Sequence, residues 1–297
     1  MCFKKILIGL VLVVPIVIIS NCKTSTTESK NIESTDTSMT DEEAIQNVKS
    51  IFYRVYLPSE MYKIFEKVGA IYTPEILNPA ENVNIYESSF KAALNLGVYG
   101  VDLGYNKIFG QQQKTLLYFT VIHKLSQQLG IPDLLFADAL KKMQQNFSNR
   151  DSMVKYATDI YVSANEYLNE NDRGIIATLV LTGGWIEAMY VASMIADEVG
   201  DQGEIIERIA FQKYSLRSLL ALLANYRSNP IINNYYLMFK ALNNSYNKFE
   251  IYYFPDDLSI DTVNKLINAK KIEFNIPKEN LKEIKEIIKR IRQEVVS

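Results

Sequence analysis

The sequence of 297 residues contains only two cysteines, Cys2 and Cys22, and one histidine, His123. A single histidine excludes the HExxH zinc motif and leaves any Ser-His-Asp triad dependent on His123. The apolar helical setting of residues 119–123 favours a structural role for that side chain. The glycines spell neither a P-loop nor the dinucleotide-binding fingerprint. We therefore expect no cofactor and no metal site.

A large excess of charge of either sign is also missing. Lys and Arg number 32 against 34 for Asp and Glu, which gives a formal net charge of −2. DNA- and RNA-binding domains carry a clustered basic surface that neutralises phosphates. The chain offers no such excess, so we do not expect nucleic acid as a partner.

The first 22 residues have the pattern of a signal peptide. Two lysines precede an uncharged run at residues 6–19, which is shorter than the roughly 20 residues that a membrane-spanning helix needs. Residues 19–22, Ile-Ser-Asn-Cys, resemble the lipobox of bacterial lipoproteins, although Asn21 stands where Gly, Ala or Ser is usual. We interpret residues 1–21 as a signal peptide and Cys22 as the lipid (palmitate) attachment site. An uncleaved N-terminal membrane anchor is the alternative.

This interpretation sets the expected location and partners. Residues 22–40 would be a lipidated cysteine followed by a Ser- and Thr-rich tether, too poor in apolar groups to fold. Residues 41–297 would form a single α-helical domain held at a membrane through Cys22, without a free thiol or disulfide. We expect an exported cell-envelope protein whose further partner is an envelope protein or a small ligand. Lys23 after the cysteine favours the outer membrane over the inner one, by resemblance to other lipoproteins.

Apolar residues recur at helical spacing through most of the remaining chain. We predict an all-α fold, a multi-helix array of antiparallel helices. The predicted helices cover residues 41–57, 59–68, 83–109, 111–129, 133–146, 151–168, 172–199, 204–227, 231–246 and 277–297, with an Asn-Pro loop at 78–79. Residues 249–254 and 272–276 can pair as a short β-ribbon around a helix capped by Ser259. The last helix is amphipathic, which suits docking on the body or, alternatively, a membrane surface.

Two acidic residues occupy apolar helical settings and are candidate ligand-binding residues. Asp102 precedes Tyr105 by three positions, and Glu187 precedes Tyr190 by three, so each acid shares a helix face with a tyrosine. Trp185 lies beside Glu187. The alternative is that each carboxylate is satisfied by neighbouring helices and only fixes their packing.

Glycines surround both acids. Gly97, Gly100 and Gly104 favour the close approach of another helix near Asp102, and a Gly-Gly pair precedes Trp185.

The segments Asn-Leu-Gly-Val-Tyr-Gly-Val-Asp-Leu-Gly-Tyr (95–105) and Leu-Thr-Gly-Gly-Trp-Ile-Glu (181–187) resemble an uncharacterised family of secreted Bacteroidetes lipoproteins. The resemblance covers most of the body and implies a lipoprotein with a helical fold. It supplies no activity and no catalytic residues.

Two functions follow from the sequence. The first is a non-catalytic binding or structural lipoprotein, favoured by the abundance of tyrosine. The second is a glycan-directed hydrolase that uses Asp102 and Glu187 as acid and base. It requires an open cleft with the two carboxyl groups roughly 5–9.5 Å apart.

Overall fold

The computed structural model describes residues 64–134, 141, 163–164, 166–200, 203–253, 258–261, 266–269 and 272–297. They all belong to one compact unit, Ser38–Ser297, and the second unit, Met1–Thr37, lies outside the described residues. The predicted signal peptide, Cys22 and tether therefore also lie outside them. The same holds for the helix predicted at 41–57 and for most of those predicted at 133–146 and 151–168.

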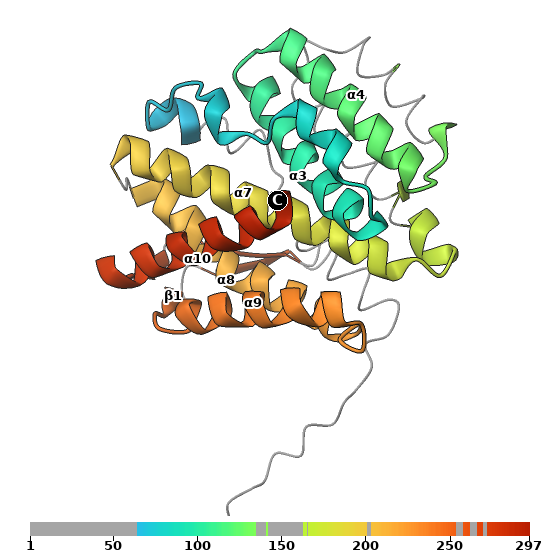
Figure 1. Ribbon diagram of the computed structural model, residues 1–297. Helices are drawn as coiled ribbons and strands as arrows, with labels where there is room; N and C mark the ends of the chain where they lie inside the picture. The colour runs from blue at the N-terminus through green and yellow to red at the C-terminus, as the bar shows by residue number, and fades with distance from the viewer. Residues whose placement is uncertain are drawn as a thin grey trace, which may run out of the picture. The chain divides into compact units, whose positions relative to one another are not determined.

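Over the described residues the fold is all-α with minor β structure, as predicted (Figure 1). Its long helices are α3 (Ser89–Ile108), α4 (Gln112–Gln128), α7 (Gly174–Val199), α8 (Gly203–Ala224), α9 (Pro230–Tyr246) and α10 (Lys278–Val296). Two short 3-10 helices, η1 (Pro74–Ile76) and η2 (Ala80–Ile85), precede α3.

Helix α7 is the centre of the core. It packs against α3, α8 and α10, while α9 packs against both α8 and α10 (Figure 1). Among the described residues, α7 is the one helix long and apolar enough to cross a membrane, but 83% of its most apolar window is buried inside the protein. A helix surrounded by other helices is apolar on every face, which accounts for this composition. The amphipathic α10 docks on the body, against α3, α7 and α9.

Helices α3 and α7 touch backbone to backbone. A Cβ atom added to Gly97 would lie 2.0 Å from the carbonyl oxygen of Val180, and one added to Gly183 would lie 1.8 Å from that of Leu94. Neither position can hold a side chain in this arrangement. The predicted close approach is confirmed at Gly97.

The same prediction is wrong at Gly100 and Gly104. No described residue lies within 4 Å of a Cβ atom added at either position. The contact with α7 is concentrated around Gly97, and the two later glycines of α3 lie beyond it.

The helix ends follow capping chemistry. The Ser88 hydroxyl accepts a hydrogen bond from the Lys91 amide at 3.2 Å, so α3 begins at Ser89 and not at residue 83 as predicted. At α9 the Asn229 side chain accepts from the amides of Ile231 (3.0 Å) and Ile232 (3.3 Å). Proline follows at the first helical position, where its missing N–H costs nothing.

The β structure agrees with the sequence in part. Strand β1 (Ile251–Tyr253) pairs antiparallel with β4 (Ile272–Phe274), which confirms the predicted ribbon. The helix predicted from Ser259 is wrong. Ser259 lies in β2 (Leu258–Asp261), which pairs antiparallel with β3 (Leu266–Ala269). The alternation Leu-Ser-Ile-Asp has the period of a strand, and this signal outweighed the serine as a helix cap.

Candidate functional site

The two acidic residues singled out by the sequence meet in the core. Asp102 comes from α3 and Glu187 from α7, each about one turn past the glycines where these helices touch. Both side chains are fully buried, at 0% exposure. Oδ1 of Asp102 has no other hydrogen-bond partner among the described residues, and the two carboxyl groups lie within hydrogen-bonding reach of each other once one of them is protonated. The close helix contact therefore forces two acids into one dry site.

Arg292 of α10 supplies the compensating charge. Its Nε donates to Oε2 of Glu187 at 3.0 Å and its Nη2 donates to Oε1 at 3.1 Å. This bidentate geometry is the strongest form of the Arg–carboxylate pair. The guanidinium also lies 4.6 Å from the ring centre of Tyr190, a cation–π contact. Tyr190 thus covers the arginine that neutralises Glu187.

One proton is held between the two carboxyl groups. Burial and the neighbouring Glu187 carboxylate raise the pKa of Asp102 well above its usual range. Burial also raises the pKa of Glu187, but Arg292 opposes that effect. Asp102 is therefore the protonated partner and donates to the Glu187 carboxylate. The cluster of Asp102, Glu187 and Arg292 is electrically neutral, which is the state that a dry interior favours.

Asn78 fixes the other side of Asp102. Its backbone N–H donates to Oδ2 of Asp102 at 3.1 Å. Its side-chain amide donates to the Tyr86 hydroxyl (2.9 Å) and to Oδ1 of Asn95 (3.2 Å), and accepts from Asn82 (2.9 Å). Asn78 is fully buried, so each of these bonds satisfies a group that would otherwise be desolvated without a partner.

Three tyrosines surround this asparagine. Tyr118 donates to the carbonyl of Asn78 at 2.9 Å. The Tyr99 ring lies 6.3 Å from that of Tyr86 and 5.8 Å from that of Tyr118. Burial raises the pKa of all three hydroxyls. They stay protonated at neutral pH and act as hydrogen-bond donors.

The network continues to the end of α10. The last carbonyls of a helix have no partner within it. The Tyr86 hydroxyl donates to the carbonyl of Val296 (3.1 Å), and the Asn95 amide donates to that of Val295 (3.0 Å). Lys91 donates to the carbonyl of Glu294 (2.5 Å). Polar side chains near the start of α3 thus cap the end of α10.

Two of the other candidate residues lie outside this cluster. Trp185 is fully buried, its Nε1 donates to the Ser215 hydroxyl at 2.9 Å, and its ring packs on Phe239. With no exposed face, Trp185 offers no surface on which a sugar can stack. The Tyr105 hydroxyl accepts from the Thr73 amide at 2.9 Å and packs the loop before α3. The structure therefore brings together Asp102, Glu187 and Tyr190, but not Trp185 or Tyr105.

Sequence reasoning missed Arg292 and Asn78. Arg292 follows the buried Ile288 by four positions and so lies on the buried face of α10. That spacing could have identified it as a partner for a buried acid. Asn78 was visible only as part of an Asn-Pro loop signal, which carries no information about burial.

The geometry restricts the chemistry of the carboxyl pair. A glycosidase keeps its two carboxyl groups roughly 5–9.5 Å apart with substrate between them. Here the groups bond directly to each other, and neither reaches solvent. In the described part of the chain, no three His, Cys, Asp or Glu side chains are placed to hold a metal ion.

Comparisons with known proteins add no further assignment. The chain matches no protein-family model, no curated protein and no solved structure.

Proposed function

We propose that this protein is a lipid-anchored component of a bacterial cell envelope whose helical body binds a partner molecule without catalysing a reaction. The observation that carries the non-catalytic part is the state of Asp102 and Glu187. These two acids are the catalytic pair that the sequence suggests, and they are buried, bonded to each other and neutralised by Arg292. A carboxyl pair in this state joins α3 to α7 and is closed to substrate.

The anchor rests on the sequence. A basic start, an apolar run of signal-peptide length and the lipobox-like residues 19–22 favour export and lipidation at Cys22. The resemblance of segments 95–105 and 181–187 to Bacteroidetes lipoproteins supports the same proposal. A lipid-modified cysteine with more than one acyl chain holds a protein stably at a membrane.

Metabolic labelling tests the anchor. Cells that express the full chain are grown with a radioactive fatty acid, alongside Cys22→Ala and the matched control Cys2→Ala. We expect the wild type and Cys2→Ala to carry label and Cys22→Ala to carry none. Equal labelling of Cys22→Ala and the wild type would refute the lipoprotein assignment.

The non-catalytic part has its own test. Asp102→Asn keeps the shape and hydrogen bonding of a protonated carboxyl but abolishes acid–base chemistry. Envelope glycan turnover in cells that express this variant should equal that in cells with the wild type. A loss of turnover in Asp102→Asn would instead favour the glycan-directed hydrolase.

A further inference from the structure

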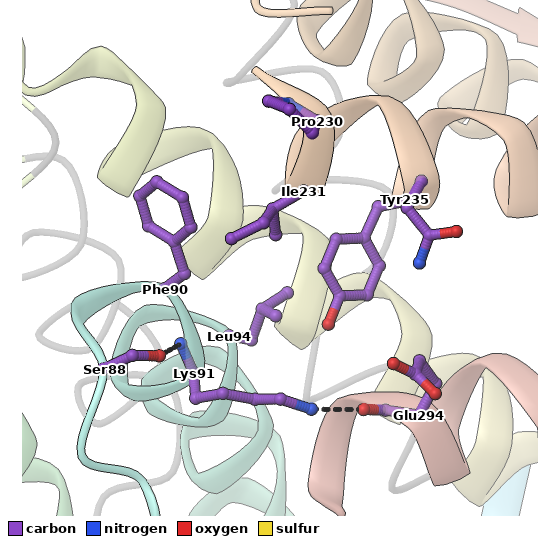
Figure 2. Close-up of a pocket in the computed structure, with 9 residues that line it drawn as sticks. Ser88, Phe90, Lys91, Leu94, Pro230, Ile231, Tyr235 and Glu294 are labelled. Carbon is purple, nitrogen blue, oxygen red and sulfur yellow. Dashed lines mark hydrogen bonds between the residues drawn. The ribbon is translucent and has the colours of Figure 1, made fainter.

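A second polar site lies at the surface, where three helices meet. A cavity of about 390 Å³ opens between the start of α3, the first turns of α9 and the end of α10 (Figure 2). This volume is near the lower end of the range for small-molecule sites. Phe90, Leu94 and Ile231 give it an apolar wall, and the Ile231 side chain is 48% exposed. The cavity suits a small ligand with an apolar part.

Tyr235 presents its hydroxyl to this cavity. The residue as a whole is only 3% exposed, and its hydroxyl is the part that reaches the open cavity. Figure 2 shows the hydroxyl directed into the space near Lys91 and Glu294. Burial, together with the Glu294 carboxylate, raises the pKa of Tyr235 to about 12. It therefore keeps its proton and is available as a hydrogen-bond donor to a ligand in the cavity.

Lys91 supplies a positive charge beside this hydroxyl. Its ammonium group donates to two main-chain carbonyls, those of Glu294 (2.5 Å) and Val295 (3.5 Å). An ammonium group has three hydrogens, so one donor remains. Among the described residues Lys91 has no carboxylate partner at ion-pair distance. A carboxylate in the cavity can therefore accept from both Lys91 and Tyr235.

Glu294 provides the opposite charge at the same cavity. Its main-chain carbonyl holds Lys91, but its carboxylate makes no hydrogen bond or ion pair within the described part of the chain. A cation, a hydroxyl donor and an anion thus line one side of a cavity whose other side is apolar (Figure 2). This pattern complements a molecule that carries a carboxylate, an ammonium group and an apolar side chain.

We propose that this cavity binds an apolar α-amino acid. Lys91 and Tyr235 receive the carboxylate, and Glu294 receives the ammonium group. The side chain of the ligand packs on Phe90, Leu94 and Ile231. This inference rests on the proposed function, since it names the ligand of a body already proposed to bind and not to catalyse.

Calorimetric titration of the full chain in detergent tests the ligand class with three probes that share the branched side chain of leucine. L-leucine carries both charged groups, 4-methylpentanoate lacks the ammonium group, and 3-methylbutylamine lacks the carboxylate. We expect leucine to bind, and each single deletion to weaken binding about tenfold or more, since each removes a charge-assisted hydrogen bond. Absence of leucine binding, or equal binding of all three probes, would overturn the proposal.

Variants then assign each contact. Tyr235→Phe should weaken leucine binding roughly fivefold and Lys91→Met about tenfold or more. Glu294→Gln should remove the preference for leucine over 4-methylpentanoate. The exposed Tyr252→Phe and Lys114→Met are matched controls and should bind as the wild type does. Tyr235→Phe removes one hydroxyl and keeps the fold, so unchanged binding in that variant would contradict the assignment.

The two proposals fail separately. A chain that labels with fatty acid at Cys22 but does not bind leucine leaves the anchor standing and removes only the ligand. A chain that binds leucine but takes up no label keeps this site and loses the anchor.

Discussion

Replacing Asp102 by Asn should stabilise the protein progressively as the pH rises. The unfolded chain binds no proton at this residue above about pH 4. The folded protein does, because burial and the neighbouring Glu187 raise the pKa of Asp102. A group whose pKa rises on folding makes the free energy of unfolding fall with rising pH, until the folded-state pKa is reached. Asparagine needs no proton and retains both a donor and an acceptor, so Asp102→Asn lacks this penalty.

The size of this pH effect on stability follows from the uptake of one proton on folding. Within the window between the unfolded pKa and the folded one, the free energy of unfolding of Asp102→Asn minus that of the wild type should grow by about 1.4 kcal/mol per pH unit. Urea unfolding followed by circular dichroism at pH 5, 6 and 7 gives both free energies by linear extrapolation. A difference that stays constant across this range would refute the shared-proton cluster.

Asp197→Asn is the control, because folding lowers the pKa of Asp197 whereas it raises that of Asp102. Burial alone would raise the pKa of Asp197, but hydrogen bonds from Lys289 (2.8 Å) and Lys285 (2.9 Å) outweigh it and lower the pKa. The stability from a lowered pKa is complete above the unfolded value and disappears only as the pH falls through the folded one. Asp197→Asn should therefore run parallel to the wild type between pH 5 and 7, displaced to lower stability.

Three further changes probe the packing around this cluster, each measured by urea unfolding. Arg292→Met and Glu187→Gln should each lower the free energy of unfolding by about 3–5 kcal/mol, because each leaves a buried charge unpaired. The double variant should lose much less than the sum of the two single losses, and additive losses would contradict a direct pair. Gly97→Ala should be strongly destabilising because its Cβ meets the backbone of α7. Gly100→Ala has open space around it and should raise the free energy of unfolding by about 0.5–1 kcal/mol. Equal effects of the two variants would contradict the contact between α3 and α7 at Gly97. Asn78→Ala should lower the free energy of unfolding by about 3 kcal/mol, because it removes three side-chain hydrogen bonds. A loss well below about 1 kcal/mol would exclude Asn78 as a centre of the network.

The helical content was predictable because it depends on local signals. Apolar spacing identified the six long helices that the structure describes, and the errors at their ends ranged from none to six residues. The start of α3 was placed too early because η2 has helix-like composition but forms a separate 3-10 turn after Pro79. A helix was also predicted where none forms: Ser259 is a residue typical of a helix cap, but it lies within strand β2.

The candidate site was predictable only in part. An acid among apolar residues on a predicted helix is unusual enough to be noticed, which is how Asp102 and Glu187 were found. That they meet depends on how α3 and α7 cross, and the sequence does not state which pair of helices touches. The partner Arg292 lies 105 residues from Glu187, on a helix whose other charges are mostly solvated. The spacing from Ile288 places Arg292 on the buried face of α10, but no local signal says which acid it pairs with.

The contacts at the end of α10 can form only after the last residues of the chain have been synthesised. Asn95 and Tyr86 hold carbonyls that lie 200 and 210 positions further along the chain, and the guanidinium of Arg292 arrives with the same helix. Before α10 docks, pressing α3 onto α7 would bury two acids with no cation beside them, which opposes early collapse. Contacts this distant also slow folding. We therefore expect a nascent chain to stay open until its final helix has emerged, which agrees with the proposed export across a membrane before folding.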